Sequence, residues 1–181
     1  LLDSRLPDRV RGYLDRNGVS ADALTLEITE SSLLIDAPRT RSTIDELHDV
    51  GLRLAIDDFG TGYSSLSYLR RLPVHELKVD QSFVSGMLAD PHDEVIVRST
   101  IDLGHNLGLR IVAEGVETMP TLDRLTQFGC DVAQGYVISP PLSGDDLIAW
   151  VAKAESARQS GLRMGASPTA WVAGAARAPV P

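Results

Sequence analysis

Five short apolar segments, each expected to form a strand, carry a charged or amide side chain at or just beyond their ends. The segments are Leu24–Ile28, Leu52–Ile56, Glu76–Val79, Arg110–Ala113 and Asp131–Ala133, and the polar residues are Glu27, Asp57-Asp58, Lys78, Glu114 and Gln134. Stretches with helical periodicity lie between the segments, and this alternation predicts a parallel sheet in an α/β fold. The carboxyl ends of parallel strands meet at one edge, so we expect these polar side chains to share one mouth.

Carboxylates that converge on one mouth repel one another unless cations lie between them. The pattern therefore predicts a divalent-metal site, and its oxygen ligands suit Mg²⁺ or Mn²⁺ better than zinc. The four histidines fall on helices or at a strand start, and we expect them to be surface or hydrogen-bonded residues. One alternative for Glu27 is a structural ion pair with Lys78 inside a barrel.

Chain length limits how much of a barrel these residues can build. The chain has 181 residues, whereas a closed (β/α)₈ barrel takes about 250. We therefore expect a partial (β/α)₈ TIM-like barrel, with about five of the eight βα units present. The chain starts at Leu1 and its first methionine is Met87, which favours a fragment of a longer protein or a processed product. The two open sheet edges should promote aggregation or completion by another polypeptide.

Composition narrows the classes of partner. A net charge of −8 and a pI of about 4.9 argue against DNA and against an anionic membrane surface. The single cysteine, Cys130, excludes an internal disulfide, and we expect it to be a small core residue. We find no signal peptide and no apolar run of transmembrane length, which predicts a cytoplasmic protein without membrane insertion.

Two regions differ in composition. Residues 1–155 carry the βα pattern and are predicted to form an incomplete barrel domain. From residue 156 to residue 181 the chain is rich in Ala, Gly and Pro, which predicts a flexible tail with Trp171 as its one large apolar residue. The expected helices are Leu2–Asn17, Pro38–Val50, Leu66–Leu72, Gln81–Leu88, Asp93–Leu107, a helix capped by Thr118 or Thr121, and a last helix capped by Ser143.

Five phrases in register make a family resemblance specific. They are Leu26-Glu-Ile-Thr-Glu-Ser31, Ile56-Asp-Asp-Phe-Gly-Thr-Gly-Tyr-Ser-Ser65, Leu77-Lys-Val-Asp80, Val112-Ala-Glu-Gly-Val-Glu-Thr118 and Ala133-Gln-Gly-Tyr136. Together, over about residues 1–152, they closely resemble the EAL domain. This resemblance implies a modified (β/α)₈ barrel that hydrolyses cyclic di-GMP to pGpG in bacterial signal transduction, with two Mg²⁺ or Mn²⁺ ions.

The resemblance also implies residue roles. Glu27 and Asp57 match ligands of the first metal, and Asp58 matches a ligand of the second. Lys78 matches the residue that contacts the attacking water and the phosphate, and Glu114 a second-metal ligand or general base. Three supporting residues match as well: Glu30 anchors the loop Asp58–Ser65, Glu117 supports the loop after its strand, and Gln134 orients site groups.

Two metal ligands of the family have no counterpart in these residues. The tripeptide Glu-Ala-Leu does not occur, and the family's asparagine ligand would precede Leu1. A further departure is Pro140, where many relatives carry a basic residue. We therefore expect the 181-residue chain by itself to be inactive as a phosphodiesterase.

The alternative to part of an enzyme is a non-catalytic remnant that binds a ligand or a partner. Expected partners are cyclic di-GMP, a second EAL domain in a homodimer, or the missing amino-terminal barrel segment. A different metal-dependent barrel enzyme, of the enolase type, fits Asp57-Asp58 and the glycine-rich loop poorly.

Overall fold

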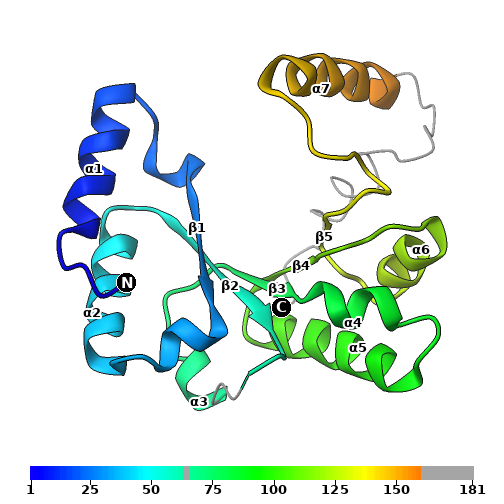
Figure 1. Ribbon diagram of the computed structural model, residues 1–181, viewed down its shortest axis with the longest axis horizontal. Coiled ribbons are helices and arrows are strands. Elements are labelled where there is room, and N and C mark those ends of the chain that lie inside the picture. Colours follow the sequence, from blue (N-terminus) through cyan, green and yellow to red (C-terminus); the bar gives the residue numbers. More distant parts are fainter. Residues whose placement is uncertain (63–65, 160–181) are drawn as a thin grey trace, which may run out of the picture. The chain divides into compact units, whose positions relative to one another are not determined.

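The computed structural model describes residues 1–62 and 66–159 and contains a five-stranded β-sheet (Figure 1). The strands are β1 (Thr25–Thr29), β2 (Arg53–Phe59), β3 (Glu76–Val79), β4 (Arg110–Ala113) and β5 (Val132–Ala133), hydrogen-bonded in chain order. The pairings of β1 with β2, β2 with β3 and β4 with β5 are parallel. The predicted α/β class and the five predicted strands are confirmed.

By its internal contacts the chain divides into two compact units. The first unit contains residues 1–80 and 102–111, and the second contains residues 81–101 and 112–181. Strand β4 and helix α5 (Pro91–Asn106) each have residues in both units.

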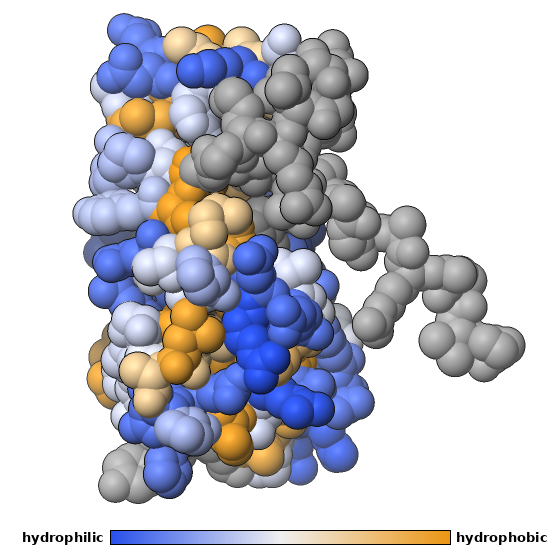
Figure 2. Space-filling view, turned by 90° about the vertical axis from the view of Figure 1, so that its right-hand side faces the viewer, coloured by the Kyte–Doolittle hydropathy of each residue, from blue (hydrophilic) through white to orange (hydrophobic). Residues whose placement is uncertain are grey.

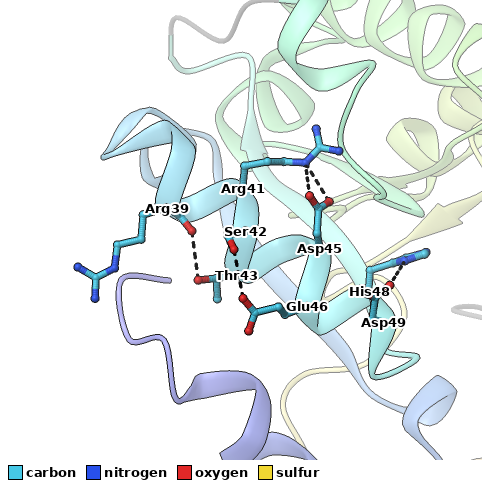
Figure 3. A network of polar contacts seen from close by, with 8 residues as sticks. All are labelled: Arg39, Arg41, Ser42, Thr43, Asp45, Glu46, His48 and Asp49. Atoms are coloured by element: carbon cyan, nitrogen blue, oxygen red, sulfur yellow. Dashed lines mark hydrogen bonds and ion pairs between the residues drawn. The ribbon is translucent and has the colours of Figure 1, made fainter.

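Helices α1 (Leu6–Asn17), α2 (Ala37–Asp49) and α3 (Leu66–Leu69) belong to the first unit, with short 3₁₀ turns η1 (Ala21–Ala23) and η2 (Glu30–Leu34). Ile44 and Leu47 of α2 are buried with the apolar residues of β1 and β2. The other face of α2 is polar: Arg41 and Asp45 form an ion pair at 2.8 Å, and Ser42 donates to Glu46 (Figure 3). This amphipathic division explains why the periodicity of α2 predicts it well.

The second unit contains α4 (Gln81–Gly86), α6 (Met119–Gln127) and α7 (Gly144–Gln159), together with the larger part of α5. Thr118 caps α6, because its hydroxyl accepts from the N–H of Thr121 at 3.3 Å. Ser143 caps α7 in the same way, through the N–H of Asp146. Both caps agree with the sequence, since a hydroxyl can satisfy an otherwise unpaired N–H of the first turn.

Most element boundaries differ from the sequence-based prediction by a few residues. Helix α1 begins at Leu6 rather than at Leu2, strand β2 continues through Asp57-Asp58 to Phe59, and α3 ends at Leu69 rather than at Leu72. Helix α7 continues to Gln159 and so includes four residues of the predicted tail. Residues 160–181, with Trp171, lie outside the described part of the chain, as do residues 63–65.

Apolar residues also reach the surface, as the orange areas among hydrophilic blue ones in Figure 2 show. On α7, Leu147, Ile148 and Val151 are exposed. Cys130 is buried as predicted, and burial raises the pKa of its thiol to about 12. Across residues 1–62 and 66–159, every helix is too short or too polar to span a bilayer.

Candidate functional site

A bulge in β2 sets the position of the paired aspartates. Ile56 lies opposite Leu77, and Phe59 lies opposite Val79, so β2 takes three steps along the chain where β3 takes two. Lys78 therefore faces the Asp57-Asp58 pair. Adjacent side chains of a regular strand point to opposite faces, and a bulge re-aims them. Asp58 has φ of 56°, a left-handed conformation that aspartate tolerates better than most residues.

Lys78 lies at the centre of a carboxylate cluster in the first unit. Its ammonium Nζ is 2.8 Å from Glu27 Oε1 and 3.0 Å from Asp57 Oδ1, and the lysine is 4% exposed. Three neighbouring strands each contribute one of these residues. A buried lysine is stable only when paired. The ion pair between Glu27 and Lys78, expected as a structural alternative, is thus present.

The residues of this cluster fit a divalent cation. Asp57 Oδ1 is buried, and the Lys78 ammonium lies 3.0 Å from it. This oxygen needs a cation beside it, a need that the shared ammonium meets in part and that a metal ion would meet as well. The carboxylates of Glu27, Asp57 and Asp58 outnumber the single ammonium of Lys78, so the cluster carries net negative charge. Carboxylate oxygens are also the ligands that Mg²⁺ and Mn²⁺ prefer.

Asp80 belongs to this cluster and received no role in the sequence-based assignment. Burial of Asp58 raises the pKa of its carboxyl, with added contributions from the charges of Asp57 and Asp80 and from a hydrogen bond with Asp80. Asp80 immediately follows β3. The rule that polar residues at strand ends gather at one mouth could therefore have identified it.

Glu30 holds the start of the loop that follows β2. Its carboxylate is buried, and Oε2 accepts hydrogen bonds from the N–H groups of Gly60 at 3.0 Å and Gly62 at 3.2 Å. A Cβ at Gly62 would lie 2.9 Å from the Glu30 carboxyl, so a larger residue here would force that carboxyl to shift. The predicted loop ran to Ser65, but residues 63–65 lie outside the described chain.

The remaining predicted site residues share a pocket in the second unit. The pocket has a volume of about 250 Å³ and is formed by the turns that follow β4 and β5 and by the start of α4. Its lining residues are Gln81, Glu114, Gly115, Glu117, Gln134, Gly135 and Tyr136. Glu114 is half-buried, whereas Glu117 and Gln134 are exposed. Gln81 and Tyr136 had no predicted role. Glu27, Glu30, Asp57, Asp58 and Lys78 belong to the first unit, whereas Glu114, Glu117 and Gln134 belong to the second. The roles assigned to these residues stay predictions.

His75 supports the sheet, as expected for a hydrogen-bonded histidine. Its Nδ1 accepts from the N–H of Leu54 at 3.1 Å, and its ring stacks on His48 with a centroid separation of 5.8 Å. His75 immediately precedes β3, at the end of the strand remote from Lys78. Burial lowers the pKa of His75, and the charges of Arg53 and His48 lower it further.

Comparison with known proteins shows that this chain is similar to EAL domains and to cyclic di-GMP phosphodiesterases. The sequence profile of the EAL domain matches residues 1–141. The bifunctional diguanylate cyclase/cyclic di-GMP phosphodiesterase MucR of Pseudomonas aeruginosa is 44% identical over 147 residues, which are 81% of this chain and 22% of MucR. The cyclic di-GMP phosphodiesterase NbdA of the same organism is 45% identical over 137 residues, 76% of this chain and 18% of NbdA. The chain thus spans about a fifth of these curated relatives.

Solved structures of related proteins are similar to this chain in both fold and sequence. The crystal structure of the EAL domain of Mycobacterium smegmatis DcpA matches with a TM-score of 0.79 and 44% identity, covering 84% of this chain and 69% of that one. The MucR phosphodiesterase in complex with cyclic di-GMP gives 0.78 and 42%, with 80% and 59% covered. A manganese and cyclic di-GMP complex of BlrP1 from Klebsiella pneumoniae gives 0.69 and 34%, with 74% and 34% covered.

Proposed function

The chain belongs to the EAL domain family, and from this premise we propose that its residues form part of a metal-dependent site that hydrolyses cyclic di-GMP to pGpG. The observation that carries the proposal is the cluster in the first unit. Carboxylates from β1 and β2 surround a single buried lysine from β3, so negative charge exceeds positive charge in the cluster. Carboxylates gathered at strand ends with excess negative charge are suited to holding a cation.

Glu27, Asp57 and Asp58 are the residues that would hold the metal, with Glu114 as a further ligand. Magnesium or manganese supplies a Lewis acid and lowers the pKa of a bound water. BlrP1, which is described with manganese in one complex and calcium in another, supports an oxygen-ligand site in this family. The fit of Asp57 Oδ1 supports it in this chain.

Lys78 supplies a fixed positive charge. Two carboxylates hold its ammonium, so the charge is oriented before any substrate arrives. A phosphodiester gains negative charge as it is attacked, and a preorganised cation stabilises that charge at little reorganisation cost. We assign Lys78 to the phosphate and the attacking water for this reason.

Glu114 and Gln134 would act from the pocket of the second unit. Glu114 is a half-buried carboxylate, which suits a residue that accepts a proton from water. The amide of Gln134 both donates and accepts, so it can orient a water or a phosphate oxygen. Glu30 would restrain the loop beside Asp58, and Glu117 would support the turn after β4.

A second candidate is a module that binds cyclic di-GMP or a partner without catalysis. The ion pairs of Lys78 with Glu27 and Asp57 favour it, because they balance part of the charge without a metal.

One pair of assays separates the candidates. A completed domain is made by fusing an amino-terminal part of the DcpA EAL domain to residues 1–181. We expect the 181-residue chain alone to form no pGpG with Mg²⁺ or Mn²⁺, and the completed domain to form it. A completed domain that binds cyclic di-GMP with metal present but forms no pGpG would establish the binding module instead.

Three further assignments come with this proposal. Residues 1–155 form the EAL part of the chain, apart from the region of different composition at 156–181. The completed domain associates with a second EAL domain, and the protein is cytoplasmic. Sedimentation of the completed domain tests the homodimer directly.

A further inference from the structure

The turns that follow β4 and β5 are joined to each other by their backbones. Strand β5 is only two residues long, but its pairing with β4 continues beyond both strands. The N–H of Gln134 donates to Ala113 O at 2.8 Å, and the N–H of Val116 donates to Gln134 O at 3.0 Å. The N–H of Val137 then donates to Val116 O, also at 3.0 Å. Val116 is fully buried, so water does not compete for these bonds.

Gly135 lies where the two turns come closest. A Cβ at this position would lie 2.3 Å from Val116 O and 2.4 Å from Val116 N. Both are backbone atoms, which cannot rotate away as a side chain can. Any other residue would therefore push the two turns apart and break the bonds that Val116 makes.

Gly115 makes a second, softer contact in the same place. Its φ is 65°, a conformation that side chains rarely adopt. A Cβ there would lie 2.4 Å from Cγ of Gln81. Cβ of Gln81 would also lie 2.8 Å away, so part of α4 would have to shift as well. Substitution of Gly115 thus meets a side chain of α4, whereas substitution of Gly135 meets the backbone of the other turn and should disturb the paired turns more.

Two predicted site residues immediately precede these glycines. Glu114 is followed by Gly115, and Gln134 is followed by Gly135, and all four line the same pocket. We propose that Gly135 is a positioning residue for the reaction: its lack of a side chain lets the two turns lock together and thereby fixes the Glu114 carboxylate and the Gln134 amide. This inference rests on the proposed function, because it assigns a task to Glu114.

The expected effect is on rate as well as on stability. A displacement of about 1 Å in a catalytic group can cost about 100-fold in rate. Replacement of Gly135 by alanine requires a shift of that order, since the Cβ must move from 2.3 Å to an ordinary contact distance. A glycine with only a structural task would instead lower stability and leave the kinetics of the folded fraction unchanged.

The test is Gly135→Ala in the completed domain, with Gly129→Ala as the matched control. Gly129 also has a positive φ, of 78°, but a Cβ there meets no atom within 4 Å. We expect kcat to fall about 100-fold in Gly135→Ala, with a weaker apparent affinity for Mn²⁺. We expect Gly129→Ala to lower the melting temperature and to keep kcat within about threefold of wild type. A folded Gly135→Ala with wild-type kcat and metal affinity would overturn the proposal.

If Gly135→Ala does not fold, the kcat of Gly115→Ala tests the proposal instead. We then expect about a tenfold loss of kcat at a melting temperature like that of Gly129→Ala, from a smaller displacement of the same carboxylate. Unchanged kcat in Gly115→Ala would overturn the inference. A wild-type completed domain without turnover, or full turnover in Glu114→Ala, would overturn the proposed function itself. Hydrogen exchange of residues 112–118 and 132–138 in the 181-residue chain then tests the locked turns independently, with faster exchange expected in Gly115→Ala than in Gly129→Ala.

Discussion

The two units present their candidate site residues by different physical means. In the first unit, charge organises the cluster: Lys78 contacts Glu27 and Asp57 at 2.8 and 3.0 Å. In the second unit, backbone bonds between two turns set the places from which Glu114 and Gln134 extend. Side chains held by charge depend on each charged partner, whereas side chains held by backbone depend on glycines that carry no chemistry. The two groups should therefore respond to different substitutions.

The largest effects should come from removing carboxylates that the proposed mechanism uses. In the completed domain we expect Glu27→Ala, Asp57→Ala and Glu114→Ala each to lower kcat by about 1,000-fold or more, because each displaces the nucleophile or the metal. Glu117→Ala is the control from the same pocket as Glu114, and we expect a loss below about tenfold. Near-normal turnover of Glu114→Ala would refute its catalytic role.

The next prediction concerns how much the charge of Lys78 contributes to the stability of the chain. Lys78→Met keeps the length of the side chain but removes the ammonium that two carboxylates surround. We expect the 181-residue chain to lose about 2 kcal/mol of unfolding free energy, a value lowered because Glu27 is half exposed. Urea unfolding measures this loss. Mn²⁺ should restore part of it if the carboxylates bind cations, and no change with Mn²⁺ would contradict that.

Sequence reasoning located the strands and the polar residues at their ends because both depend on local patterns. Glu76–Val79 was placed to the residue, since its apolar run and flanking residues are unambiguous. The bulge at Asp57-Asp58 was not predicted, because it depends on the register between β2 and β3. Asp80, in contrast, directly follows β3 and was within reach of the strand-end rule, and the structure adds its hydrogen bond with Asp58.

The loop after β2 should show a moderate effect. We expect Glu30→Ala to leave the completed domain folded but to weaken Mn²⁺ affinity by about tenfold. The reason is that the Glu30 carboxylate accepts two N–H groups of the loop next to Asp58. Isothermal titration with Mn²⁺ gives the affinity, and Glu46→Ala on the exposed face of α2 is the control. Equal affinities for wild type and Glu30→Ala would leave Glu30 with a structural task alone.

The smallest effect should be a dependence of stability on pH through His75. The pKa of His75 is lowered in the folded state, so the unfolded chain binds the proton more readily. The contribution of this neutral histidine is complete above the unfolded pKa of about 6.5 and is lost as pH falls toward the folded value. Protonation would also displace the N–H of Leu54 from Nδ1.

Urea unfolding between pH 5 and pH 8 measures this dependence. We expect His75→Gln, whose amide oxygen can still accept from Leu54, to show a flatter profile than wild type below pH 6.5. His92, on an exposed helix start, provides the control as His92→Gln. Identical slopes for wild type and His75→Gln would remove His75 as the source.

The most direct test of the central claim is pGpG formation by the completed domain as Mn²⁺ is titrated, compared with Asp57→Asn. Asparagine keeps the shape of Asp57 but removes the charge of the carboxylate whose buried oxygen contacts Lys78. We predict metal-dependent turnover in wild type, none after removal of metal by EDTA, and a loss of about 1,000-fold in Asp57→Asn. Equal turnover of the two proteins at every Mn²⁺ concentration would contradict a metal site built on this cluster.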